Sequence, residues 1–276
     1  MVVRDNKEHG FTLIELAIVI IISGLLFIPL FRIYDNFLKV KQLSDTRLNI
    51  NLSSEQVSLF NTLNGRYPCP ADPTLAVGDP GYGREFVADC DPAGIIAAGL
   101  SVAGDCTNTA GPGTGVCLVA GSRDTDADAD IVNDLVFIGS VPILDLMDVS
   151  GLLTGVRSSL DAWNSKLTYA TSQYLTQSSS YKFFRGVISA QDEFGNDTAG
   201  IQDDAHYVII SHGKDRKGAY SENGGIVSPC TAGITDSENC DGDSTFVSSI
   251  GFYKANGAQY YDDMVFFAKS TASSIW

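Results

Sequence analysis

Glu15 is the ionisable side chain with the clearest chemical consequence in this sequence. It is the only charged residue in the apolar run of residues 10–31. Placing a carboxylate in hydrocarbon costs about 2.5 to 3.5 kcal/mol on insertion scales, so an acid near the start of a membrane span implies a partner charge. The run is long enough to span, since about 20 apolar residues suffice to cross a bilayer. We therefore expect Glu15 to meet a cation.

Gly10, Phe11 and Glu15, followed by the apolar run, resemble the processing signal of type IV pilins and type II secretion pseudopilins. The resemblance implies that a membrane prepilin peptidase cuts between Gly10 and Phe11 and methylates the new amine of Phe11. Glu15 would then face the Phe11 amine of a neighbouring subunit during filament assembly, and residues 1–10 would be the leader. Gly24 also matches the family, whereas Pro29 lies about one helical turn earlier than the usual family proline.

Two simpler interpretations of the N-terminus are a secretory signal peptide and a plain membrane anchor. A signal peptide would have a basic start and a small-residue cleavage site after its apolar run. Here Arg4 and Lys7 are balanced by Asp5 and Glu8, and no such site follows the run. A plain anchor fits the length but leaves Glu15 unexplained. The sequence therefore favours the pilin-like interpretation.

Six cysteines lie outside the apolar run, and an even number in an exported chain suggests disulfides. Pairing between nearest neighbours is the simplest choice, and other pairings stay open. It joins Cys69 to Cys90, Cys106 to Cys117, and Cys230 to Cys240. A zinc site is disfavoured, because the chain has no CxxC pair and no cysteine–histidine spacing of the zinc type.

The net charge of −15 makes the chain an unsuitable partner for nucleic acid, because an acidic surface repels phosphates. The only candidates for a local basic patch are Arg185, Lys214, Arg216 and Lys217, and we expect these residues on solvated loops.

Residues 11–31 and 32–65 are predicted to form one long helix, with a membrane-spanning half followed by an amphipathic half. A break near Pro29 or at Ser44–Asp45 is the alternative. Gly65 predicts the end of the helix, with prolines following it. The face predicted to pack under the head carries five apolar residues, namely Phe37, Leu48, Leu52, Leu59 and Leu63.

Residues 66–276 are predicted to form a disulfide-containing, β-rich periplasmic or extracellular head. Strands collected after one long helix indicate an α+β fold, with an antiparallel sheet packed on the second half of the helix. The glycine- and proline-rich residues 66–120 are typical of loops. Residues 66–72 resemble a segment of some prepilin-like proteins, and we expect them to form a disulfide-pinned crossing from helix to head. The predicted strands are residues 136–138, 166–170, 181–189, 207–211, 248–253 and 264–268.

Two groups of aspartates raise the question of calcium, the only cofactor that the sequence suggests. The alternating run Asp124, Asp126, Asp128 and Asp130 fails the EF-hand pattern, because Ala129 and Leu135 replace the required Gly and Glu. An exposed acidic loop is the simpler interpretation of this run, and a calcium loop of another type is the alternative.

A second calcium hypothesis follows from the family resemblance. Residues 161–164 and 211–215 resemble two turns of pseudopilin heads. That resemblance implies a calcium site at Asp215 with Asp262 or Asp263. The chain departs from the family here, because residues 216–261 stand where the family has a short loop.

Catalytic motifs are not found around the three histidines, His9, His206 and His212, so we expect no enzyme. The expected function is that of a minor pilin-like structural subunit in a type II secretion pseudopilus or a type IV pilus. Its expected partners are prepilin peptidase, other pilin-like subunits and the inner-membrane assembly platform. Before assembly it would sit in the bacterial inner membrane with its head in the periplasm. A surface- or substrate-binding tip module is the alternative; a membrane-anchored exported enzyme would have no use for Glu15.

Overall fold

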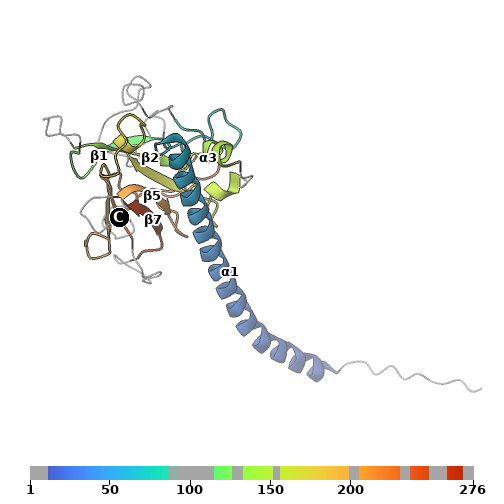
Figure 1. Cartoon of the computed structure of the whole chain (residues 1–276). Helices are drawn as coiled ribbons and strands as arrows, with labels where there is room; N and C mark the ends of the chain where they lie inside the picture. The colour runs from blue at the N-terminus through green and yellow to red at the C-terminus, as the bar shows by residue number, and fades with distance from the viewer. Residues whose placement is uncertain are drawn as a thin grey trace, which may run out of the picture. The chain divides into compact units, whose positions relative to one another are not determined.

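The computed structural model describes residues 12–86, 90, 115–125, 133–151, 156–198, 205–230, 237–248 and 260–269. The chain divides into two compact units, residues 1–44 and 45–276. One long helix, α1 (Leu13–Asn64), contributes residues to both units, and the second unit also holds a five-stranded antiparallel sheet (Figure 1). The predicted α+β class is confirmed.

The first unit contains the apolar part of α1. The helix is long and apolar enough to cross a membrane by length and composition. It continues through Pro29 and past Ser44, so the alternative of two broken helices is wrong. The boundary between the two units nevertheless falls at Ser44–Asp45.

The end of α1 lies in the second unit, at the predicted place. The helix stops at Asn64, and Gly65 follows with a φ of 68°. Its amide donates to the carbonyl oxygen of Asn61 at 2.8 Å. A glycine in the left-handed region just after the last helical residue is the common way to end a helix, because it carries no Cβ to clash.

The main sheet has the strand order β1-β2-β3-β5-β7, with every neighbouring pair antiparallel. Tyr207 and Ile209 of β5 (Ala205–Ser211) face one side, and Val208 and Ile210 face the other, because side chains alternate along a strand. Val208 and Ile210 belong to the main apolar cluster of the head. The strands are β1 (Cys117–Ala120), β2 (Leu135–Ser140), β3 (Thr168–Ser172), β5 (Ala205–Ser211) and β7 (Met264–Lys269).

A second, two-stranded sheet pairs β4 (Ser189–Gln191) with β6 (Thr245–Val247), and these strands run parallel. Ala190 and Phe246 join it to the main apolar cluster. A short helix, α3 (Ile143–Ser150), follows β2. The sequence analysis did not foresee the parallel pair, α3 or β1.

The strand predictions for residues 181–189 and 166–170 need correction. Residues 182–185 form a turn, closed by a hydrogen bond from the Arg185 amide to the Lys182 carbonyl at 2.9 Å, and only Ser189 is in a strand. The run of aromatic residues resembled a strand, but Phe183 and Phe184 are exposed. Strand β3 also begins later than predicted, at Thr168. Of residues 248–253, only Ser248 is described, and it lies just after β6.

The predicted buried face of α1 is wrong for four of its five residues, and the fifth, Leu52, is half-buried. Leu48 and Leu63 are 56% and 61% exposed, Leu59 is exposed, and Phe37, in the first unit, is exposed as well. In the second unit the helix buries a different and more polar set of residues. These are Thr46, Ile50, Ser53, Ser54, Gln56, Val57 and Phe60.

Small polar side chains of α1 explain this choice of face. Asn49 Nδ2 donates to the carbonyl oxygen of Leu160 at 2.8 Å, and Ser53 Oγ donates to that of Ser158 at 3.3 Å. Thr46 Oγ1 accepts the amide of Ala162 at 3.0 Å. Buried backbone groups need such partners, and leucines on this face would have left these groups without them.

Candidate functional site

The N-terminal end of α1 carries the first group of predicted site residues. Gly10 and Phe11 lie outside the described residues, whereas Thr12 and Glu15 are described and exposed. Glu15 Oε2 accepts both the amide and the hydroxyl of Thr12 at 2.9 Å, and Thr12 Oγ1 in turn accepts the Glu15 amide at 3.4 Å. This reciprocal pattern is a capping box at the start of the helix.

The capping box adds a role for Glu15 that the sequence analysis missed. The pattern of Thr12 followed three residues later by Glu, just before an apolar run, was a readable signal. A carboxylate at a helix N-terminus is also favoured by the helix dipole. Glu15 therefore has neutral hydrogen-bond donors within its own chain, but no cation lies among these donors.

Two disulfides are described, Cys69–Cys90 and Cys230–Cys240, each with a Cα–Cα distance of 5.7 Å. Both are pairs of nearest neighbours in the sequence. Cys117 is also disulfide-bonded, while its expected partner Cys106 lies outside the described residues.

Polar contacts add to the disulfide at the crossing from helix to head. Arg66 binds Glu85 through both carboxylate oxygens, at 2.6 and 2.9 Å. Glu85 also accepts the amide of Cys69 at 2.6 Å. These contacts support a structural role for residues 66–72.

Asp215 and Asp262, two of the predicted calcium ligands, lie close together at the turn after β5. Asp262 Oδ2 accepts the amides of Lys214 and Asp215, at 2.8 and 3.2 Å. Gly213 in this turn has a φ of 55°, and a Cβ there would lie 2.4 Å from the carbonyl oxygen of Asp262. Burial raises the pKa of Asp262, and the charge of Asp215 adds to this effect. Asp263 accepts a hydrogen bond from Asn239 at 2.8 Å instead.

The donor set at this turn is a poor calcium cage as it stands. Calcium takes six to eight oxygen ligands, usually including free carboxylates. Asp215 is already paired with the Lys217 ammonium at 2.6 Å, and Asp262 Oδ2 also accepts the Tyr260 hydroxyl at 2.7 Å. Calcium would have to displace Lys217, so this site stays a prediction. Of the alternating aspartates, Asp124 alone is described.

A different carboxylate group, which we call the acidic trio, consists of Glu238, Asp241 and Asp243. One carboxylate oxygen from each lies within 4.8 Å of the others. Burial raises the pKa of all three residues, that of Asp241 to about 6, and the charges of neighbouring members raise the pKa of Glu238 and Asp241 further. Among the described residues no cation contributes to these shifts, so within this part of the chain the trio is a concentration of negative charge.

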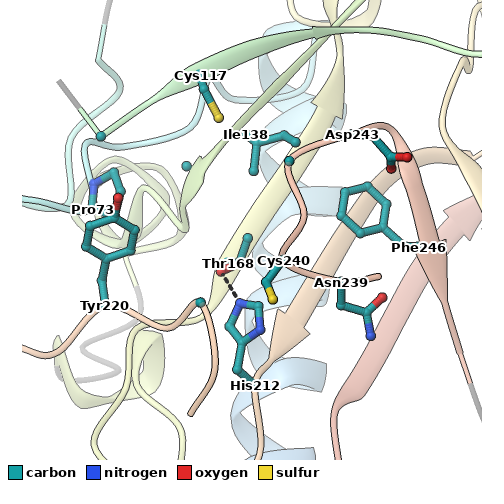
Figure 2. Close-up of a pocket in the computed structure, with 14 residues that line it drawn as sticks. Pro73, Cys117, Ile138, Thr168, His212, Tyr220, Asn239, Cys240, Asp243 and Phe246 are labelled. Atoms are coloured by element: carbon teal, nitrogen blue, oxygen red, sulfur yellow. Dashed lines mark hydrogen bonds between the residues drawn. The ribbon is translucent and has the colours of Figure 1, made fainter. Parts of the chain in front are cut away.

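A cavity of about 60 Å³ lies between Cys117, Ile138, Cys240 and His212 (Figure 2). His212 is 2% exposed, and its Nε2 lies 2.9 Å from Thr168 Oγ1. Burial lowers the pKa of His212 to about 4, against a smaller opposite effect of Asp215, so the ring is neutral at pH 7. Nδ1 has no hydrogen-bond partner among the described residues. The Thr168 hydroxyl and the His212 ring are within hydrogen-bond reach, but among the described residues no third group orients the ring through Nδ1, as a nucleophile–base pair requires.

Two other described residues, His206 and Arg216, have structural contacts. His206 Nε2 donates to the carbonyl of Phe183 at 2.6 Å, and Nδ1 accepts the hydroxyl of Tyr67 at 3.2 Å. Arg216 donates to Ser165 Oγ at 2.7 Å. These contacts do not assemble a phosphate-binding patch from the described basic residues.

Comparison with known proteins finds similarity at the N-terminus. Residues 5–31 match the family model of the prokaryotic N-terminal methylation motif. No curated protein and no solved structure matches the chain. The family with this motif is structural and not enzymatic, and the apolar helix with the motif fits a membrane-anchored pilin. Over these residues the chain is therefore similar to the N-terminus of type IV pilins and pseudopilins.

Proposed function

We propose that this chain is a minor subunit of a type II secretion pseudopilus or a type IV pilus. Prepilin peptidase cleaves it between Gly10 and Phe11 and methylates the Phe11 amine. The apolar part of α1 holds it in the bacterial inner membrane, with the head in the periplasm, until the assembly platform adds it to the filament. The observation that carries this proposal is the prepilin motif with Glu15 at the start of a membrane-length helix.

The capping box supports a specific role for Glu15 in assembly. One carboxylate oxygen, Oε2, takes both Thr12 donors. Among the described residues the other oxygen, Oε1, makes no hydrogen bond, so it is available to the amine of a neighbouring Phe11. Thr12 thus orients the carboxylate without neutralising it, and the full negative charge remains to be paired in hydrocarbon.

The outward face of α1 in the second unit supports contacts with other helices. Leu48, Leu59 and Leu63 are exposed there and are spaced so that they share one side of the helix. Several exposed leucines on one side of a helix suit a contact with another apolar surface, although the exposed Glu55 lies between Leu48 and Leu59 on this side. In a filament this side would pack against the helices of neighbouring subunits.

The test compares Glu15→Gln with Thr12→Ala in cells that carry the assembly machine. Glutamine also serves in a capping box, so Glu15→Gln keeps the helix start and removes only the charge. We expect this variant to be inserted and cleaved but to assemble poorly. Thr12→Ala weakens the cap by about 1 kcal/mol and should assemble. Mass spectrometry of the N-terminus reports cleavage and methylation, and sheared filaments report assembly.

Normal assembly of Glu15→Gln would refute the pairing of Glu15 with an amine. An uncut native chain would refute the whole proposal. Copy number in purified filaments distinguishes a minor from a major subunit. A few copies per filament support a minor subunit, and abundance along the shaft contradicts it.

A further inference from the structure

Residues 182–185, which we call the aromatic turn, expose two phenylalanines between two cations. Phe183 and Phe184 are 59% and 47% exposed, and their rings meet edge to face at 5.6 Å. Lys182 and Arg185 flank them, and the Lys182 ammonium lies 5.9 Å from the centre of the Phe184 ring. Large aromatic residues and arginine are the side chains that most often dominate the binding energy of an interface.

The aromatic turn is held in place by its backbone carbonyls. The Arg123 guanidinium donates to the carbonyl oxygen of Phe184 at 3.1 Å and to that of Gly186 at 2.7 Å. His206 holds the carbonyl of Phe183 from the sheet side. A surface that is already ordered loses little conformational entropy on binding, so these contacts favour recognition.

The charge of the aromatic turn is opposite to that of the rest of the chain. Residues 162–191 contain no acidic residue, although the chain has 33 and a net charge of −15. Among the described residues, Lys182 and Arg185 form no ion pair. The turn therefore offers the exposed Lys182 ammonium and the half-buried Arg185 guanidinium, which packs 4.6 Å from the centre of the Tyr174 ring. The complement of these two cations and the exposed aromatic rings is a surface rich in carboxylates.

The acidic trio and the aromatic turn each precede one strand of the small sheet in the sequence. Strands β4 and β6 are parallel, with Ser189 opposite Thr245. The aromatic turn comes shortly before β4 and the acidic trio shortly before β6, so both precede the N-terminal ends of neighbouring parallel strands. Among the described residues, no ion pair joins the two groups. Each group has the charge that the other lacks, but they do not neutralise one another within one chain.

We propose that two copies of this chain pair through this end of the β4–β6 sheet, with the aromatic turn of each copy against the acidic trio of the other. Because the two groups precede neighbouring parallel strands of one sheet, the same contact can form twice about a two-fold axis, which is how identical subunits most often associate. Such pairing does not require cleavage at Gly10 or incorporation into a filament. It therefore stands or fails independently of the proposed function.

The decisive experiment is a charge exchange in the full chain, solubilised in a neutral detergent. The first variant is Lys182→Glu with Arg185→Glu, which makes both groups negative. The second is Glu238→Lys with Asp241→Lys, which makes both groups positive on balance; it keeps Asp243, whose Oδ1 accepts the Thr245 amide at 2.6 Å. Each variant alone should self-associate at least about tenfold more weakly than the native chain. An equimolar mixture should recover native-like association, because opposite charges then face each other in both contacts. Sedimentation velocity measures the dimer fraction.

Further variants distinguish a loss of pairing from misfolding and from binding to a different partner. Phe183→Ser with Phe184→Ser should weaken pairing, whereas Phe194→Ser, at a phenylalanine that is 79% exposed elsewhere, should not. Lys182→Glu alone is the milder form of the first variant. Carbodiimide coupling in a mixture of ¹⁴N- and ¹⁵N-labelled native chains should join Lys182 of one copy to the acidic trio of the other. The proposal is overturned if the mixed variants associate no better than each alone, if coupling occurs only within one chain, or if the turn binds anionic vesicles while native chains stay monomeric.

Discussion

The two faces of α1 between Asp45 and Asn64 differ in a way that reverses the usual pattern of an amphipathic helix. The face toward the sheet buries hydroxyl and amide side chains around three apolar residues, Ile50, Val57 and Phe60. The opposite face carries exposed leucines, including Leu48 and Leu63. Specific hydrogen bonds, and not apolar area alone, therefore dock this part of the helix on its own head. The apolar area on the other face is not used within the head.

The strongest way to test this contrast is to truncate one apolar residue on each face. Phe60 is 3% exposed and lies under the Arg66 guanidinium, 5.1 Å from the ring centre. We expect Phe60→Ala to lower the free energy of unfolding by about 3 to 5 kcal/mol, because a buried aromatic leaves a cavity. The matched outward variant, Leu63→Ala, should change it by less than about 0.5 kcal/mol. Thermal or chemical unfolding of the full chain measures both values, and equal losses would contradict the assignment of the two faces.

A pH dependence is expected from Asp161, in the loop that meets the inward face of α1. Burial raises the pKa of Asp161 to about 6, although the Ser165 and Trp163 amides and the Ser211 hydroxyl bind its carboxylate. Folding thus favours the protonated acid. The contribution of this protonation to the free energy of unfolding is fully present below the pKa of Asp161 in the unfolded chain, near 4. It is lost as the pH rises through about 6. We expect a loss of about 1 to 3 kcal/mol over this range.

The control for this dependence is Asp161→Asn, which does not titrate. Its amide oxygen can accept the Trp163 and Ser165 amides, and its amide nitrogen can donate to the Ser211 hydroxyl oxygen, which reverses that one hydrogen bond. Between pH 4 and pH 7 the free energy of unfolding should change less with pH for this variant than for the native chain. Identical slopes would show that other buried acids, such as Asp241 and Asp262, cause the dependence.

A smaller effect is expected from the hydroxyl of Tyr207, which joins β5 to the inward face. It is hydrogen-bonded to Ser54 Oγ at 3.2 Å and to Ser58 Oγ at 3.4 Å. Tyr207→Phe should cost about 1 kcal/mol, since a net hydrogen bond contributes that much and Ser54 is buried. A double-mutant cycle with Ser54→Ala measures the coupling. Simple additivity of the two changes would show that the hydroxyl does not act through Ser54.

The sequence predicted features that depend on local chemistry. Strands β2, β5 and β7 are runs of apolar and β-branched residues. Gly65 ends α1 because glycine readily adopts the left-handed conformation found there. The same local reasoning paired Cys69 with Cys90 and Cys230 with Cys240.

Prediction from local sequence failed where contacts with residues distant in the sequence determine which side chains are buried. The inward face of α1 is chosen by carbonyl and amide groups of residues 158–162, which no periodicity of the helix reveals. The aromatic turn resembled a strand because its phenylalanines have high strand propensity, but their exposure is set by the contacts of Arg123 and His206.

Polar substitution on the outward face is expected to have the smallest effect on folding, and it is the most informative test of function. Glutamine and leucine have similar helix propensities, so Leu48→Gln with Leu63→Gln should leave the free energy of unfolding within about 0.5 kcal/mol of the native value. The same variant removes apolar contacts that neighbouring helices would need, so incorporation into filaments should fall. Glu55→Gln, on the exposed side of the same helix, is the polar control and should assemble normally. A destabilised head would mean that the leucines pack within the chain. An intact head with normal assembly would mean that filament contacts do not use this face, and the reversed chemistry of α1 would then need another partner.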